Sequence, residues 1–314
     1  MARDPELATF LEEPFPNDLD DVIGTRLILA NRLAEAMTRR IATPDHLSWR
    51  DEVIVGPDAS PLTLRIYVDE SSPAPQGALL FFHGGAFVFG DLESEHDRCL
   101  RLADGSGCVV VSVDYRLAPE NPFPAALDDA MCALRWLFDH AESLDVDSSR
   151  IGVGGASAGG ALAALVVLQA RDSGSLPLRA QLLIYPATDD RASDRSITQY
   201  ERSEPWDGER TRKMWALYLA DDAARASRYA SPARAEDVSG LPVTYVLVAE
   251  EDPLRDQALD FAQRLLNSGV SVDLRIFAGT YHGFDVVAPN ARLSQVAIKD
   301  QHDFVRRELG AVGT

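Results

Sequence analysis

A serine between two glycines, in the pattern G-x-S-x-G, stands near the middle of the chain at Gly155-Ala156-Ser157-Ala158-Gly159. The pattern directly follows the apolar run Ile151–Val153 and directly precedes a helical pattern that begins near Ala158. A nucleophilic serine needs this strand, sharp turn and helix, because the turn exposes the hydroxyl and the glycines leave room for a strained backbone. A glycine-rich packing turn is the simpler interpretation, but the order of the flanking elements favours Ser157 as a nucleophile.

A serine nucleophile needs a base, and the base needs an acid that orients it. Among the six histidines, His282 is the one that stands in a loop just after a predicted strand. Asp252 is the acid candidate, because it closely follows the apolar run Val243–Val248. All three candidates would lie at the carboxyl ends of strands, where open α/β sheets place their sites. Three nearby carboxylates compete with Asp252, and spacing alone does not exclude them: Glu250, Glu251 and Asp256.

A loop of small residues follows the apolar run Ala78–Phe82 and reads His83-Gly84-Gly85-Ala86. Small residues let backbone N–H groups approach the oxygen of a substrate carbonyl, where negative charge develops during acyl transfer. Two such groups are expected from among Gly84, Gly85 and Ala86, and a further one from Ala158. His83 is expected to brace the loop through hydrogen bonds. An ordinary β-turn is the alternative interpretation of this loop.

The elements that must position these residues form a regular pattern from residue 78 onward. Short apolar runs alternate with helical segments, which is typical of a parallel sheet covered by helices on both faces. The expected strands of this sheet are Ala78–Phe82, Cys108–Val113, Arg150–Val153, Ala180–Tyr185, Val243–Val248 and Val272–Phe277. The expected helices are 93–104, 124–141, 158–172, 254–269 and 292–309. Two earlier runs, Glu52–Val55 and Leu62–Val68, are expected to form an antiparallel pair.

Two segments outside this pattern are expected to cover the site. Residues 187–238 contain no clear buried strand, but they carry an amphipathic segment near 209–220. An insertion of this length in a compact fold usually has a function. The N-terminal segment, residues 1–45, contains an expected helix at 18–41. We predict that the two segments form a cap, over a core of residues 46–186 and 239–314. Four aromatic residues could line a substrate pocket or fill the interior of the cap: Phe87, Trp206, Trp215 and Tyr218.

Charge and composition exclude several classes of protein. The 314 residues include 30 basic and 49 acidic side chains, and a net charge of −19 disfavours nucleic acid and anionic membrane surfaces as partners. The sequence contains no stretch of 18 apolar residues and no signal-peptide pattern, so we expect a cytoplasmic protein without a membrane span. Three cysteines without C-x-x-C spacing argue against disulfides and a zinc site.

Five ordered segments together resemble the hormone-sensitive-lipase family of α/β-hydrolases, in its bacterial family IV branch. The segments are His83-Gly84-Gly85-Ala86-Phe87, Asp114–Ala125, Gly155–Gly160, Asp252–Asp256 and His282-Gly283-Phe284. The resemblance implies an α/β-hydrolase fold with a mostly parallel eight-stranded sheet and a helical cap. It also implies a serine carboxylesterase that uses no metal and no organic cofactor. Two positions depart from the family pattern: Ala86, where glycine is usual, and Ala156, where Asp or Thr is common.

The resulting hypothesis is a serine carboxylesterase that hydrolyses short- to medium-chain esters through an acyl-enzyme, with a small-molecule ester and water as its partners. An amidase or formamidase with the same triad is the first alternative. A second alternative is a non-catalytic ligand receptor, because the family includes a plant hormone receptor without the catalytic histidine. His282 is present in this sequence, which weakens the receptor hypothesis. A homodimer is left open.

Overall fold

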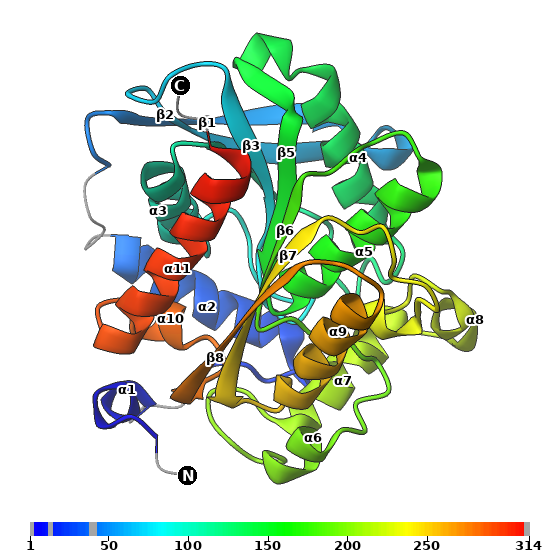
Figure 1. The fold of residues 1–314 in the computed structure, drawn as a ribbon. Coiled ribbons are helices and arrows are strands. Elements are labelled where there is room, and N and C mark those ends of the chain that lie inside the picture. The colour runs from blue at the N-terminus through cyan, green and yellow to red at the C-terminus, as the bar shows by residue number, and fades with distance from the viewer. Residues whose placement is uncertain (1–2, 12–14, 38–42, 311–314) are drawn as a thin grey trace.

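The sheet of this protein holds eight strands in the order β1-β2-β4-β3-β5-β6-β7-β8. The computed structural model describes residues 3–11, 15–37 and 43–310 (Figure 1). The strands are β1 Leu47–Val55, β2 Pro61–Asp69, β3 Gln76–Phe82, β4 Val109–Val113, β5 Val146–Ala156, β6 Ala180–Ile184, β7 Val243–Glu251 and β8 Val272–Tyr281. The pairs β1–β2 and β2–β4 are antiparallel, and the other neighbours are parallel. The predicted α/β-hydrolase sheet, with its antiparallel start, is therefore confirmed.

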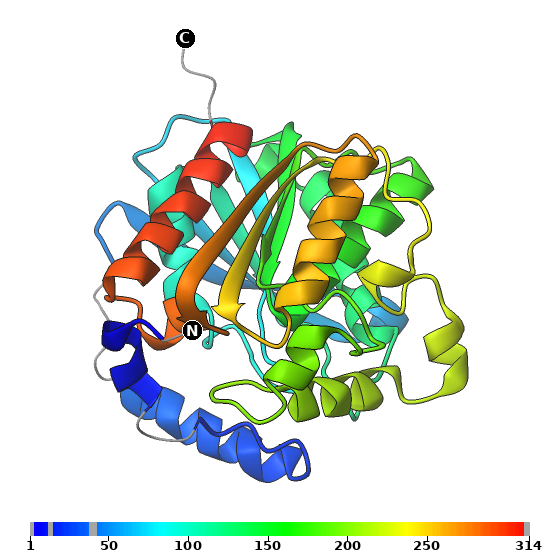
Figure 2. The same ribbon diagram turned by 60° about the horizontal axis from the view of Figure 1, so that its bottom comes forward.

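Helices cover both faces of the sheet, and in Figure 2 the strands lie between two layers of helices. Every residue of β3 and β4 is buried, which explains why these segments read as continuous apolar runs. One face packs against α3 (His96–Ser106) and α11 (Arg292–Leu309). The other face packs against α4 (Ala125–Asp139), α5 (Ala158–Ser173) and α9 (Arg255–Asn267).

The remaining α-helices of the described residues lie toward the carboxyl ends of the parallel strands, and all but α10 belong to the two predicted cap segments (Figure 2). They are α1 Pro5–Ala8, α2 Val22–Met37, α6 Arg195–Gln199, α7 Gly208–Leu219, α8 Asp222–Ala226 and α10 Phe284–Val287. Lys213 of α7 forms an ion pair of 2.6 Å with Asp20, which joins the two predicted cap segments. The division of the chain into core and cap stays a prediction.

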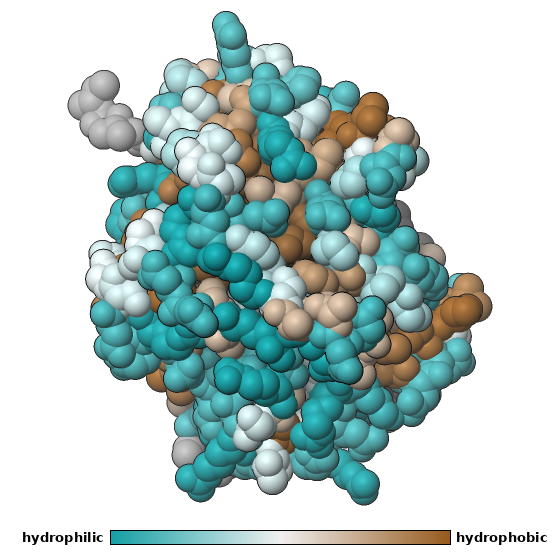
Figure 3. All heavy atoms as spheres, turned by 90° about the vertical axis from the view of Figure 1, so that its right-hand side faces the viewer, coloured by the Kyte–Doolittle hydropathy of each residue, from teal (hydrophilic) through white to brown (hydrophobic). Residues whose placement is uncertain are grey.

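The expected helix at 18–41 is shorter at its start than the pattern indicated. It begins at Val22 because the carboxylate of Asp21 accepts a hydrogen bond of 2.9 Å from the N–H of Gly24, as a helix-capping residue does. The expected positions 38–41 lie outside the described residues. Ile23 and Leu27, two apolar residues of this helix, are 68% and 63% exposed. The face of the molecule in Figure 3 is largely hydrophilic, with its apolar residues in separate groups.

The loop that follows β4 is held to α4 by an ion pair. Arg116 contacts the carboxylate of Asp129 through Nε and Nη2, at 2.9 and 2.8 Å, and its own backbone N–H donates to the same carboxylate at 2.9 Å. Asp129 is only 1% exposed, and Arg116 is the basic residue paired with it. The arrangement fits a role for Arg116 in supporting the loop.

Replacing Arg116 with methionine is expected to lower the free energy of unfolding by about 3 kcal/mol, because a buried carboxylate would lose its counter-charge. Urea denaturation of the two proteins measures this difference. The double variant Arg116→Met with Asp129→Leu is the control, and it should recover most of the loss. A loss below about 1 kcal/mol in the single variant would contradict this prediction, because it would show that water compensates the charge of Asp129 when Arg116 is removed.

Candidate functional site

Three side chains from three separate turns form one hydrogen-bonded chain. Ser157 stands between β5 and α5, Asp252 directly follows β7, and His282 directly follows β8. The Oγ atom of Ser157 lies 2.9 Å from Nε2 of His282. Nδ1 of the same ring lies 2.7 Å from Oδ2 of Asp252. The structure thus brings together the three residues that the sequence selected for catalysis.

The structure also separates Asp252 from its three competitors. Asp252 is 1% exposed, and its second oxygen accepts a hydrogen bond of 2.8 Å from the backbone N–H of Leu254. The other carboxylates have partners elsewhere: Glu250 accepts from Gly279, Glu251 pairs with Arg3, and Asp256 pairs with Arg255. Asp252 is therefore the carboxylate that orients the imidazole in this structure.

The backbone of the turn at Ser157 is strained and firmly held. Ser157 has φ 57° and ψ −118°, a conformation that side-chain-bearing residues rarely adopt. A Cβ atom at Gly155 would lie 2.2 Å from the carbonyl oxygen of Gly159, which is why the turn needs glycine there. The N–H of Ser157 donates to Ile184 at 2.9 Å, and its carbonyl accepts from Ala161 and Ala187. These bonds fix the position from which the hydroxyl points to His282.

The loop after β3 is braced by His83, as the sequence predicted. Nδ1 of His83 donates to the carbonyl of Gly84 at 2.7 Å, and the ring stacks on Tyr115 at a centroid distance of 4.1 Å. The hydroxyl of Tyr115 donates to the carbonyl of His83 at 2.8 Å. Complete burial lowers the pKa of His83, so its imidazole stays neutral at pH 7. These contacts are those of a structural residue.

The same loop presents backbone N–H groups next to the serine. Gly85, Ala86 and Phe87 all have positive φ angles, of 111°, 60° and 60°. A Cβ atom built on Gly84 would lie 3.6 Å from Cβ of Ser157, so the loop passes close to the nucleophile. Within the described residues, the hydrogen bonds of this loop give the N–H groups of Gly84, Gly85 and Ala86 no acceptor. Ala158, the first residue of α5, contributes an N–H that no intrahelical carbonyl can satisfy.

An arginine of the N-terminal segment supports this loop from the other side. Nε of Arg26, in α2, donates to the carbonyl of Val88 at 2.8 Å. Its Nη2 donates to the carbonyl of Ala118 at 2.8 Å, and the guanidinium also pairs with Glu120 at 2.7 Å. The N–H of Ala118 in turn donates to the carbonyl of Phe87 at 2.9 Å. No local motif marks Arg26 in the sequence, because it lies 62 positions before Val88.

The four aromatic candidates occupy two different places. Phe87 stacks on Tyr218 at 3.8 Å and lies 5.6 Å from Trp215, and all three rings are buried. These rings join α7 to the loop that follows β3. Trp206 lies apart from them, with its ring 6.2 Å from the imidazole of His282 and its Nε1 donating to Thr211. Of the four, Trp206 is the ring placed beside the hydrogen-bonded chain.

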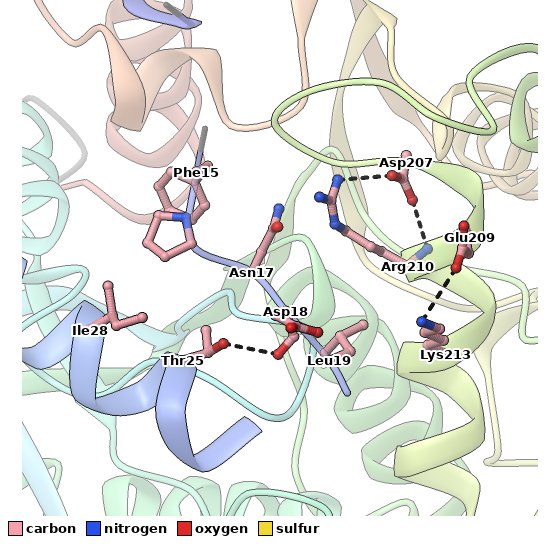
Figure 4. A pocket seen from close by; sticks show the side chains of 11 residues that line it. Phe15, Asn17, Asp18, Leu19, Thr25, Ile28, Asp207, Glu209, Arg210 and Lys213 are labelled. Atoms are coloured by element: carbon pink, nitrogen blue, oxygen red, sulfur yellow. Dashed lines mark hydrogen bonds and ion pairs between the residues drawn. The ribbon is translucent and has the colours of Figure 1, made fainter. Parts of the chain in front are cut away.

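A separate cavity of about 400 Å³ lies between the N-terminal segment and α7 (Figure 4). Figure 4 shows Asp207 bonded to Arg210 and Glu209 paired with Lys213, so both basic side chains at its wall have an acidic partner there. The residues that line it are Phe15, Pro16, Asn17, Asp18, Leu19, Thr25, Ile28, Asp207, Glu209, Arg210 and Lys213. None of the predicted site residues belongs to this lining.

The described residues offer neither a cluster of metal ligands nor a membrane-spanning helix. Across residues 3–11, 15–37 and 43–310, no group of three or more His, Cys, Asp or Glu side chains is arranged to hold a metal ion. Within the same part of the chain, no helix is both long enough and apolar enough to cross a bilayer. The three cysteines are free thiols, with Cys99 and Cys108 buried and Cys132 half-buried.

Comparison with known proteins agrees with the fold and the order of the motifs. A family model described as the alpha/beta hydrolase fold matches residues 79–286. Esterase LipI of Mycobacterium tuberculosis is 37% identical over 287 residues, which cover 90% of this chain and 88% of that protein. The structure of esterase LipW from Mycobacterium marinum superposes with a TM-score of 0.91 at 37% identity, and covers 98% of this chain and 96% of that one.

A structure named bacterial heroin esterase gives a TM-score of 0.93 at 38% identity, over 99% of both chains. The similarity to these proteins extends over the N-terminal segment and residues 187–238 as well as the sheet. The chain therefore belongs to the α/β-hydrolase fold family, in its hormone-sensitive-lipase branch.

Proposed function

We propose that this protein is a serine carboxylesterase that hydrolyses esters of short- to medium-chain acids. The observation that carries the proposal is the chain of hydrogen bonds from Ser157 through His282 to Asp252, at 2.9 and 2.7 Å. A serine in this arrangement is activated by the adjacent base, and the base is oriented by the acid. The similar proteins described above are named esterases, which favours esters over amides.

In the acylation step, Oγ of Ser157 attacks the carbonyl carbon of the ester while Nε2 of His282 takes its proton. Asp252 accepts a hydrogen bond from Nδ1, which keeps Nε2 free to act as the base and stabilises the imidazolium that forms. The C–O bond to the alcohol then breaks, and the alcohol leaves with the proton from His282. Water then attacks the carbonyl carbon of the acyl-enzyme while His282 again takes the proton. This second step releases the acid and restores Ser157.

The negative charge of the tetrahedral intermediate is expected on an oxygen that points between the loop after β3 and the start of α5. The N–H groups of Gly84, Gly85 and Ala86, which have no acceptor among the described residues, come from one side, and that of Ala158 comes from the other. The start of a helix adds a favourable dipole. Donors held in place before the reaction stabilise this charge without reorganising, and one such donor contributes about 10²-fold or more to the rate.

The site is enclosed by large side chains, which supports a limit on acyl length. Ser157 is only 8% exposed, and the Trp206 ring stands beside His282. The stacked rings of Phe87 and Tyr218 close the region between α7 and the loop. An acyl group must fit beside these rings, so we expect a short one to bind better than a fatty chain.

Hydrolysis of p-nitrophenyl esters from acetyl through butyryl and octanoyl to palmitoyl tests this function. We expect kcat/KM to be highest between acetyl and octanoyl, and to fall at least about tenfold for palmitoyl, because one methylene in a pocket changes discrimination by up to about 1–3 kcal/mol. The p-nitroanilide with the best acyl group is the matched amide. Faster cleavage of the anilide would favour the amidase alternative, and tight ester binding without turnover by folded protein would favour a receptor.

A further inference from the structure

A buried polar network lies beside the hydrogen-bonded chain but takes no part in it. Its five members come from four separate parts of the chain, and none is more than 7% exposed. They are Glu95 before α3, Arg98 in α3, Tyr185 after β6, Asp285 in α10 and Gln301 in α11. Burying charges is costly, and hydrophobic residues of similar size often serve stability as well. Stability alone therefore does not explain why these charged residues are buried here.

Every member of this network forms at least one hydrogen bond to another member, and the donor and acceptor of each bond are defined. Arg98 donates to Glu95 at 2.7 Å, to Asp285 at 2.8 Å and to the hydroxyl of Tyr185 at 2.9 Å. The hydroxyl of Tyr185 donates in turn to Asp285 at 2.7 Å, and Gln301 donates to the same carboxylate at 3.0 Å. Burial opposes ionisation of Asp285, but the charge of Arg98 and these hydrogen bonds lower its pKa. The Tyr185 ring is thus anchored at its hydroxyl by two charged partners.

The network reaches His282 through two connections. The ring of Tyr185 meets the imidazole edge-on, with centroids 4.8 Å apart and planes at 61°. Asp285 lies three positions after His282, at the start of α10, so its bonds to Arg98 also hold the segment that follows the histidine. The backbone of Tyr185 has a positive φ of 35° and donates its N–H to Leu247. The ring is therefore held at both ends while it packs against the imidazole.

We propose that Tyr185 is a positioning residue for His282, and that Arg98 and Asp285 hold it in place. The proposal rests on the proposed function, in which His282 is the base. During one cycle the imidazole accepts a proton from Ser157 and then gives it to the leaving alcohol, so a small rotation of the ring weakens both transfers. The anchored Tyr185 ring limits that rotation. Among the described residues, its side chain forms no hydrogen bond with the nucleophile or Asp252, and its ring contact is with the histidine, so it acts through the histidine.

Tyr185→Phe tests the proposal, because it keeps the ring and removes the hydroxyl that anchors it. With p-nitrophenyl acetate in stopped flow, we expect both the acylation burst and the steady-state rate to fall about tenfold, since misplacement by about 1 Å costs up to about 10²-fold. KM should stay within about twofold of the wild-type value, because the substrate contacts are unchanged. Tyr185→Leu, which removes the ring, should lower both rates further.

Tyr245→Phe is the matched control. Tyr245 is a buried tyrosine of β7 that packs on Phe304, and its hydroxyl has no partner in the described part of the chain. Both tyrosine-to-phenylalanine variants remove one buried hydroxyl, but only one lies beside His282. We expect the control to keep wild-type rates. Equal losses in the two variants, a rate for Tyr185→Phe within twofold of wild type, or a change in KM alone would overturn the proposal.

A second measurement does not depend on ester turnover. The Nδ1–H proton that His282 shares with Asp252 gives a downfield proton NMR resonance, which reports the geometry of that bond. We expect it to shift or broaden in Tyr185→Phe and to stay unchanged in Tyr245→Phe. A wild-type protein that cleaves no ester would overturn the proposed function, whereas an unchanged resonance in Tyr185→Phe would overturn the positioning role.

Discussion

Replacing Ser157 with alanine is expected to lower kcat for the best ester by about 10⁵-fold or more, because the remaining groups cannot form the acyl-enzyme. The fold should be retained. The bonds that hold the turn use backbone atoms: the N–H of Ser157 to Ile184, and its carbonyl to Ala161 and Ala187. The hydroxyl has one described partner, Nε2 of His282. Alanine therefore removes the reacting atom and leaves the supports of the turn unchanged.

The measurement is the steady-state rate of purified variant and wild type, together with their melting temperatures. Ser143→Ala, at an exposed serine whose hydroxyl donates to the carbonyl of His140, is the control and should keep full activity. A Ser157→Ala rate within tenfold of wild type would show that another group attacks the ester. A steady-state rate lower by about 10⁵-fold or more, with an unchanged melting temperature, is the expected pair of results.

Replacing Asp252 with asparagine is expected to lower kcat by about 10⁴-fold, as the loss of the acid does in other triads. The structure gives the reason. One oxygen of Asp252 accepts from the N–H of Leu254, so the asparagine oxygen is fixed at that position. Its NH₂ group must then face Nδ1 of His282, which can only accept from it. The proton moves to Nε2, and the imidazole can no longer take the proton of Ser157.

The control for this change is Glu251→Gln, which alters a neighbouring carboxylate by the same chemistry. Glu251 pairs with Arg3 and has no described contact with His282, so we expect a change of less than about threefold. A loss below tenfold in Asp252→Asn would contradict the assignment of the acid. Comparing kcat with KM completes the test, because loss of a tautomer affects kcat and leaves substrate binding largely intact.

The parts of the site that were predicted from the sequence are those encoded by a local pattern. Ser157 was marked by the strand, turn and helix around it, and His282 and Asp252 by their places after strands. The choice among the four nearby carboxylates needed three-dimensional contacts, because all of them follow the same predicted strand, Val243–Val248. The pairs Arg98–Asp285 and Arg26–Val88 could not be predicted, since their members are far apart in sequence.

The same distinction applies to the fold. The long buried strands and the amphipathic helices have clear periodicities, and the structure contains them with shifts of a few residues at their ends. The short helices α6, α8 and α10 were missed, because four or five residues are too few to show a helical period. Ile23 and Leu27 fit an apolar helical pattern, yet both side chains are exposed. The sequence could not show this, because the pattern does not reveal which face of the helix has a neighbour.

The contacts of Arg26 have a consequence for the timing of the reaction. If the N-terminal segment moves aside to admit an ester, the bonds from Arg26 to the carbonyls of Val88 and Ala118 must break. The loop that offers its N–H groups to the developing negative charge then loses a support until the segment returns. Substrate entry and full reactivity would belong to different conformations, and closure over the bound ester would restore the support. Such a site would be least reactive when it is open to water.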